Sequence, residues 1–204
     1  MTNRKLVYIV DDEGAIRRSA SFMLKTSGYA VQTWPTGVAF LKEVRHMPAG
    51  CVLLDVRMPE MDGLEVQQAL IERGVTMPVI ILTGHADVSI AVRAMKAGAV
   101  DFLEKPFEKA VLIGAIENAF ARIAATDGAA ARAAEADVVL GVLTPREREV
   151  LEGLAQGLPN KTIAYDLGIS PRTVEVHRAN LMAKLEVRSL SDALRLAFAA
   201  GMGA

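Results

Sequence analysis

The first part of the chain alternates between short apolar runs and longer segments in which apolar residues recur with helical spacing. The apolar runs predict five β-strands, over residues 6–10, 30–34, 51–54, 79–82 and 100–103. Four of these runs have no clear polar alternation, which is typical of a parallel sheet covered on both faces. The segments of helical period predict five helices, over residues 15–27, 37–45, 63–73, 87–97 and 108–123. Three of them are followed by a glycine suited to end a helix, at Gly28, Gly74 and Gly98.

This five-fold strand–helix alternation predicts an α/β fold, a doubly wound five-stranded parallel sheet within about 120 residues. Sheets of this kind bind their ligands beyond the carboxyl ends of the strands. The sequence therefore directs attention to the residues that follow each predicted strand.

The second part of the chain lacks strand-like runs. Alanine dominates residues 124–136, which predicts a partly helical linker because alanine forms helices well but buries little apolar area. Four segments of helical period follow, over residues 145–156, 160–167, 171–185 and 189–200. We therefore expect a sheet domain over 1–124, a linker over 125–140 and an all-α domain over 141–204.

Two local signals mark the helical domain. Thr144 is a good N-cap, Pro145 suits the first helical position, and Glu147 stands where a capping box requires it. Further on, a short helix stopped by Gly168 is followed by Ser170 and a second helix. Helix, glycine-containing turn and helix are typical of a helix-turn-helix.

Composition and charge exclude several classes of protein. The 204 residues include 23 Lys and Arg against 24 Asp and Glu, which argues against indiscriminate coating of nucleic acid but allows one local basic face. An apolar stretch of roughly 18 residues, as a membrane span requires, does not occur in the sequence. One cysteine, Cys51, supports neither a disulfide framework nor a thiolate metal cluster, so we expect a cytoplasmic protein without membrane partners.

Polar residues with complementary chemistry follow four of the predicted strands. Asp11 and Asp12 follow the first, Asp55 the third, Thr83 the fourth and Lys105 the fifth. Clustered carboxylates repel one another unless a cation joins them, and a hard divalent ion such as Mg²⁺ suits oxygen ligands. Asp55 could then act as a nucleophile toward a phosphoryl group, and Thr83 could hydrogen-bond the phosphoryl oxygens. Lys105 would supply a mobile ammonium that pairs with a carboxylate or with a phosphoryl oxygen.

Each of these residues alone has a simpler interpretation. Asp12 could cap the helix that follows it, Thr83 could supply a turn hydroxyl, and Lys105 could be a solvated amine. All of them together at one edge of the sheet are less easily explained that way.

Residues 4–124 resemble the receiver domain of two-component response regulators. The resemblance rests on Asp11-Asp12, the segment from Asp55 to Gly63, Thr83-Gly84-His85 and Lys105-Pro106-Phe107. It implies that Asp55 is the phosphoacceptor. It also implies that Asp12, Asp55 and the backbone carbonyl of Arg57 bind Mg²⁺ or Mn²⁺, with Asp11 assisting through water. Thr83 and Lys105 would contact the phosphoryl group.

The same resemblance implies three further features. The Lys105–Pro106 peptide would be cis, and Phe102 would be the aromatic residue that moves as Thr83 turns toward the phosphoryl group. Two activated receivers often pair through their fourth helix and fifth strand, which here would involve Val92 and Lys96. Phe102 could equally be a core residue, and Val92 and Lys96 could belong to an ordinary half-exposed helix.

The second helix of the predicted helix-turn-helix carries a polar face. Val174 and Leu181 point inward by period, and Val176 and Leu185 do so only if the buried face is broader. The remaining side chains suit either solvent or a DNA major groove, and residues 160–188 hold five basic against three acidic side chains.

The run from Leu143 to Met202 is similar to the LuxR/FixJ-type output domain. This similarity rests on the segments 143–151, 157–164, 169–177 and 178–185. It implies phosphate or base contacts from Lys161, Arg172, Thr173, His177, Arg178 and Lys184, with Glu175 and Val176 as possible base readers. Pro159 stands where many members have Ser or Thr, which leaves the cap of that helix in doubt. The last helix, over 190–198, often pairs two output domains, although Leu194 and Phe198 could simply pack in the core.

The two resemblances together indicate a transcriptional response regulator of the NarL/FixJ family rather than a turnover enzyme. We expect a sensor histidine kinase to phosphorylate Asp55, and the modified chain to dimerise, or to release its helix-turn-helix, on operator DNA, with RNA polymerase as a possible partner. A Mg²⁺-dependent phosphohydrolase is a rival, but Arg57 stands where such enzymes need a second acid. A regulator that binds DNA independently of phosphorylation is another.

Overall fold

The computed structural model describes residues 5–84, 88–124, 136 and 138–203. Contacts divide the chain into two compact units, residues 1–86 with 97–126 and residues 87–96 with 127–204. Of the linker expected over 125–140, residues 125–135 and 137 lie outside the described part of the chain, as does His85.

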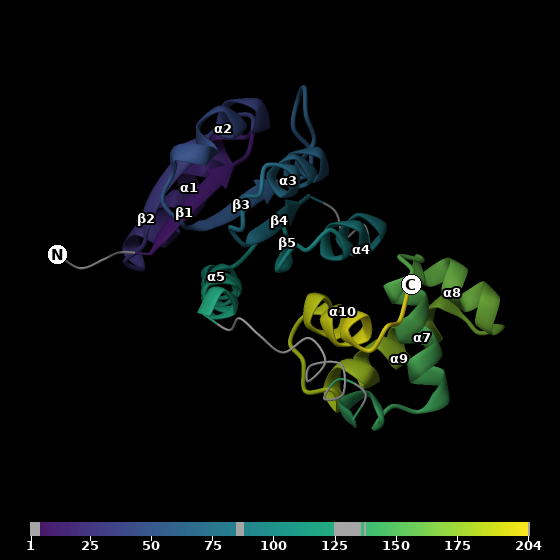
Figure 1. The fold of residues 1–204 in the computed structure, drawn as a ribbon. Helices are drawn as coiled ribbons and strands as arrows, with labels where there is room; N and C mark the ends of the chain where they lie inside the picture. Colours follow the sequence, from purple (N-terminus) through teal and green to yellow (C-terminus); the bar gives the residue numbers. More distant parts are fainter. Residues whose placement is uncertain (1–4, 85–87, 125–135, 137, 204) are drawn as a thin grey trace. The chain divides into compact units, whose positions relative to one another are not determined.

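The first unit is built around a parallel sheet of five strands (Figure 1). The strands are β1 (Leu6–Val10), β2 (Ala30–Trp34), β3 (Cys51–Asp55), β4 (Val79–Thr83) and β5 (Asp101–Glu104). Their order is β2-β1-β3-β4-β5, so the predicted doubly wound sheet is confirmed. The connections leave β1 and β3 toward opposite edges of the sheet, and this change of direction is where such sheets bind ligands.

The predicted strand limits are close to the observed ones. β1 and β2 have the predicted bounds, whereas β3 and β4 each continue for one further residue, to Asp55 and Thr83. Both residues pair with a neighbouring strand, Asp55 with Leu82 and Thr83 with Glu104. The β-sheet ladder therefore holds the backbone of these two polar residues in place.

Helices alternate with the strands as predicted. They are α1 (Gly14–Thr26), α2 (Gly37–Glu43), α3 (Gly63–Glu72), α4 (Val88–Lys96) and α5 (Lys109–Ala124). The helix expected over 37–45 is shorter than predicted, because its last turn tightens into the 3₁₀ helix η1 (Val44–His46). Gly28, Gly74 and Gly98 have φ angles of 92°, 69° and 90°, so each supplies the left-handed conformation expected after a helix.

Apolar side chains cover both faces of the sheet. On one face, Val7 and Ile9 belong to a buried cluster with residues of α1 and α5, among them Leu24 and Ile116. On the other face, the rings of Tyr8, Trp34 and Phe40 lie 5.3–6.3 Å apart. Since successive strand residues point to opposite faces, a strand buried on both sides needs the continuous apolar run seen in β1.

The C-terminal helices form a core of their own. They are α7 (Pro145–Ala155), α8 (Asn160–Leu167), α9 (Pro171–Lys184) and α10 (Leu190–Ala199). Leu151, Leu154, Val174, Leu181 and Leu194 are completely buried. Leu194 is therefore a core residue, as one of the two interpretations had it. The helices α8 and α9, with the turn between them, have the predicted helix-turn-helix arrangement.

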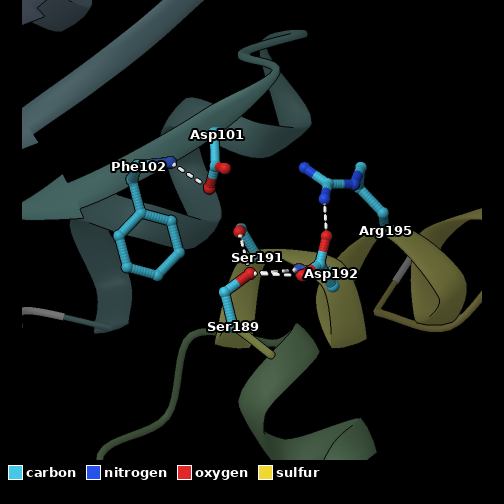
Figure 2. A network of polar contacts seen from close by, with 6 residues as sticks. All are labelled: Asp101, Phe102, Ser189, Ser191, Asp192 and Arg195. Atoms are coloured by element: carbon cyan, nitrogen blue, oxygen red, sulfur yellow. Dashed lines mark hydrogen bonds and ion pairs between the residues drawn. The ribbon is translucent and has the colours of Figure 1, made fainter. Parts of the chain in front are cut away.

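Side-chain caps begin three of these helices. Thr144 and Glu147 form the predicted capping box at the start of α7. Ser170 Oγ accepts from the backbone N–H of Thr173 at 3.1 Å, and Ser189 Oγ accepts from the N–H of Asp192 at 3.2 Å (Figure 2). α8 is the exception, because its N-cap is Pro159, which offers no side-chain hydrogen bond.

Within the described residues, the structure contains no helix of the length and apolar character that a membrane crossing demands.

Candidate functional site

Three carboxylates meet at the carboxyl ends of β1 and β3. Each of Asp11, Asp12 and Asp55 offers an oxygen within 4.8 Å of those of the other two. Asp11 and Asp55 are buried, and Asp12 is exposed. The parallel strands thus place the three predicted metal-binding side chains at one point of the sheet edge.

Lys105 lies between the two buried carboxylates. Its Nζ is 2.7 Å from Asp11 Oδ2 and 3.0 Å from Asp55 Oδ1, and its side chain is 8% exposed. Glu13 Oε1 lies further away, at 3.6 Å. The alternative of a solvated amine is therefore wrong, and the ammonium pairs with carboxylates, one of the two kinds of partner expected for it. The Lys105–Pro106 peptide is cis, as predicted.

Burial and charge shift two pKa values in the cluster. Burial raises the pKa of Asp55 to about 6; the ammonium of Lys105 opposes this rise, and the negative charges of Asp11 and Asp12 add to it. Burial lowers the pKa of Lys105, but its contacts with Asp11 and Asp55 outweigh this effect and the net shift is upward. Lys105 therefore stays charged at neutral pH and partly neutralises the cluster.

Asp11 is fixed from several sides. Its N–H donates to the carbonyl of Trp34 at 3.2 Å, and its Oδ1 accepts from the N–H of Glu13 at 2.8 Å. Its carbonyl oxygen accepts from Nη1 of Arg17 at 2.5 Å. The N-cap of α1 is Glu13, so the alternative that Asp12 caps this helix is wrong.

Sequence reasoning missed Glu13 and Arg17. A signal for Arg17 was available, because helical side chains lean toward the N-terminus of their helix. An arginine in the second turn of α1 can therefore reach back to the strand that precedes the helix.

The donor set suits a hard divalent cation. Its ligand atoms are carboxylate oxygens, which Mg²⁺ and Mn²⁺ favour. Oδ2 of Asp11 is buried and, within the described residues, accepts no hydrogen bond of normal geometry, although the ammonium of Lys105 lies beside it. Arg57, whose carbonyl is the fourth expected ligand, lies two residues beyond Asp55 with an exposed side chain.

The two predicted switch residues lie on the neighbouring strands. Thr83 ends β4 and is buried, and its carbonyl accepts from the N–H of Lys105 at 2.7 Å. Phe102 lies on β5 and is half-buried; its N–H donates to Oδ1 of Asp101 at 2.8 Å (Figure 2). Val92 and Lys96 both lie on α4.

Most of the predicted DNA-contacting side chains are accessible on α8 and α9. Lys161, Arg172 and Glu175 are exposed, and Thr173 and His177 are partly exposed. Val176 is 52% exposed, so the alternative that it points into the core is wrong, whereas Leu185 is buried.

Two of the basic residues predicted to contact DNA already have partners within the helical domain. Nη1 of Arg178 donates to Oδ1 of Asn160 at 3.1 Å, which links α9 to the start of α8. Nζ of Lys184 lies 2.8 Å from Oε2 of Glu147, a carboxylate that is 4% exposed. The hydrogen bond from Lys184 lowers the pKa of Glu147 despite its burial. Neither contact was predicted from the sequence.

The fold and these two sites define a two-domain response regulator with a receiver domain and a helix-turn-helix domain. Family models agree: residues 7–117 match the response regulator receiver domain, and residues 141–197 match the bacterial regulatory proteins of the luxR family. The chain belongs to the response regulators that combine these two domains.

Several relatives match the chain over nearly its whole length. The chain is 49% identical to the transcriptional regulatory protein FixJ of Rhizobium meliloti strain 1021, over 97% of each chain. It is 48% identical to FixJ of Azorhizobium caulinodans, over 96% of this chain and 93% of the relative. The crystal structure of full-length FixJ from B. japonicum is similar with a TM-score of 0.59 and 45% identity, covering 98% of this chain and 99% of that one.

Replacement of Asp55 by asparagine is expected to stabilise the metal-free protein at pH 7 by about 1–3 kcal/mol. The raised pKa of Asp55 means that ionising this buried carboxyl lowers the free energy of unfolding, by roughly 1.4 kcal/mol per pKa unit. The folded state takes up the proton below about pH 6. The advantage of Asp55→Asn should therefore shrink as the pH falls from 6 to 4. Urea unfolding at pH 7 and pH 4 measures it.

Asp12→Asn is the control, because Asp12 is exposed and its repulsion is the smallest of the effects that raise the pKa of Asp55. A gain from Asp55→Asn that is no larger than the gain from Asp12→Asn would contradict this account of the cluster.

Lys184→Met is expected to lower the free energy of unfolding of the helical domain by about 1–2 kcal/mol, because it leaves the carboxylate of Glu147 buried without its cation. Lys161→Met, which removes an exposed lysine of α8, should change it by less than about 0.5 kcal/mol. Chemical unfolding followed by circular dichroism measures both. Equal effects would show that the pair with Glu147 contributes nothing to stability.

Proposed function

We propose that this chain is a transcriptional regulator that accepts a phosphoryl group on Asp55 from a sensor histidine kinase and thereby changes its binding to operator DNA. The observation that carries the proposal is the meeting of Asp11, Asp12, Asp55 and Lys105 at one sheet edge, in a chain that also holds a helix-turn-helix. The proposed boundaries are 1–124 for the receiver, 125–140 for the linker and 141–204 for the DNA-binding domain.

The geometry supports Asp55 as the nucleophile. A carboxylate oxygen of Asp55 forms a bond to phosphorus while the bond from phosphorus to the imidazole nitrogen of the donor histidine breaks, and the imidazole leaves with that electron pair. The ammonium of Lys105, 3.0 Å from Asp55, would pair with a transferred phosphoryl oxygen, and the hydroxyl of Thr83 would donate to another. Asp11, Asp12, Asp55 and the carbonyl of Arg57 would hold Mg²⁺ or Mn²⁺, which offsets negative charge on the phosphoryl group.

The DNA-binding part of the proposal rests on the exposed side chains of α8 and α9. Lys161, Arg172, Thr173 and His177 would contact phosphates or bases, and Glu175 and Val176 would read base edges. Arg178 and Lys184 remain candidates, but their contacts with Asn160 and Glu147 make positioning of α9 their first role. Since bacterial operator DNA lies in the cytoplasm, the proposal includes a cytoplasmic location.

Coupling between the two sites would begin with Thr83 and Phe102. Movement of Thr83 toward the phosphoryl group, followed by Phe102, would alter the receiver surface and favour dimers, with Val92 and Lys96 at the pairing surface. Two DNA-binding domains on a two-fold operator then bind with a high effective concentration, so a modest pairing energy changes occupancy strongly. RNA polymerase would be the further partner at the promoter.

Two alternatives make different predictions. A Mg²⁺-dependent phosphohydrolase would turn over phosphomonoesters steadily, whereas the proposed regulator is not a turnover enzyme. A regulator that ignores phosphorylation would bind operator DNA equally well before and after treatment with beryllofluoride. Footprinting with parallel mass determination separates these cases.

Incubation with a radiolabelled acyl phosphate is expected to give acid-stable, hydroxylamine-sensitive label in the native chain and none in Asp55→Asn. Asp62→Asn is the matched control, because Asp62 lies in the same loop region, caps α3, and asparagine caps equally well. Gel autoradiography and mass spectrometry provide the readout. Label that persists in Asp55→Asn would exclude Asp55 as the acceptor.

Lys161→Met is expected to weaken binding to a mixed-sequence duplex and to reduce the slope of log K against log salt by about 0.9, the loss of one phosphate contact. Lys25→Met, which removes an exposed lysine at the end of α1 in the other domain, should leave the slope unchanged. Fluorescence anisotropy over a range of salt concentrations measures both slopes. An unchanged slope for Lys161→Met would remove Lys161 from the interface.

A further inference from the structure

Arg17 makes a side-chain hydrogen bond to the backbone beside the carboxylate cluster. Its guanidinium reaches back past the first turn of α1, and Nη1 donates to the carbonyl oxygen of Asp11 at 2.5 Å. Arg17 itself belongs to α1 through its N–H, which donates to the carbonyl of Glu13 at 3.1 Å. The side chain therefore connects the body of the helix to the peptide group that joins Asp11 to Asp12.

This peptide group decides where Asp12 lies. The side chain of Asp11 is completely buried and is fixed by Glu13 and Lys105. Asp12 is exposed, so its position relative to Asp11 depends on the orientation of the peptide between them. A hydrogen bond to the carbonyl of that peptide restricts the rotation that would swing Asp12 away from the cluster.

We infer that Arg17 is a positioning residue for divalent-cation binding: it holds the Asp11–Asp12 peptide so that the carboxylate of Asp12 stays beside those of Asp11 and Asp55. The inference rests on the proposed function, because it assumes that these carboxylates bind Mg²⁺. Pre-organised ligands bind more tightly, since less conformational freedom is lost on binding.

Charge and geometry make opposite predictions for Arg17. As a positive charge near the cluster, Arg17 repels a cation, so its removal would tighten Mg²⁺ binding. As a clamp on the peptide, it favours the bound arrangement, so its removal would weaken binding. We expect the clamp to dominate, because the guanidinium bonds directly to the backbone of one ligand residue.

The test is a Mg²⁺ titration of the full-length chain, with Mg²⁺ as the only ligand, by calorimetry and by the fluorescence of Trp34. Trp34 is the single tryptophan, and its carbonyl accepts from the N–H of Asp11. Arg17→Met is expected to raise the Kd for Mg²⁺ about three- to ten-fold, less than the roughly 10- to 100-fold found for residues that bond directly to a metal-ligating side chain, because Arg17 bonds to the backbone. Arg17→Lys, which keeps a donor and the charge, should recover part of this loss.

Arg18→Met is the matched control, because it removes the same charge from an exposed neighbouring residue of α1. Amide hydrogen exchange of the metal-free protein gives an independent readout: the Glu13 N–H, bonded to Asp11, should exchange faster in Arg17→Met than in Arg18→Met. A merely structural role would lower the free energy of unfolding without these local effects.

The possible outcomes distinguish a failure of the positioning role of Arg17 from a failure of the metal site itself. Tighter or unchanged Mg²⁺ binding in Arg17→Met would overturn the positioning role while leaving the metal site intact. Equal losses in Arg17→Met and Arg18→Met would also overturn it. Absence of Mg²⁺ binding in the native chain would overturn the metal site in the proposed function, and the inference with it.

Discussion

Repulsion among three carboxylates at one sheet edge is the constraint on which the candidate site of the first unit depends. Asp11 and Asp55 are buried, and like charges at such close range are costly unless a cation joins them. Lys105 supplies one positive charge against three negative ones, so the cluster keeps an excess of negative charge. The site therefore retains an attraction for a further cation, and the fold bears the cost of maintaining it.

The rest of the first unit holds that unfavourable cluster in place. The β3–β4 ladder fixes Asp55, the backbone of Thr83 holds Lys105, and Trp34 on β2 holds Asp11. These contacts are backbone hydrogen bonds within or beside the sheet, and the apolar faces of the strands stabilise the sheet itself. Hydrophobic burial of the sheet thus offsets the unfavourable free energy of the carboxylate cluster.

The sequence predicted the elements well because their signals are local. Short apolar runs, four of them without polar alternation, predicted every strand to within one residue, and the capping box at Thr144 located the start of α7. The gathering of Asp11, Asp12, Asp55 and Lys105 was also predictable, because parallel strands carry their following residues to one edge. What could not be predicted were contacts set by side-chain reach between distant positions. The pairing of Lys184 with Glu147, 37 residues apart, and the hydrogen bond from Arg178 to Asn160 both depend on packing that no local pattern encodes.

The bond between Lys184 and Glu147 has a consequence for how the regulator meets its operator. Glu147 also accepts from the N–H of Thr144, so one buried carboxylate joins the last turn of α9 to the first residues of α7. The C-terminal end of α9, the helix that would enter the DNA major groove, is thus already bonded to α7 in the absence of nucleic acid. Under the proposed function, association with DNA would be the docking of a preformed domain, and phosphorylation would change how many such domains are presented together.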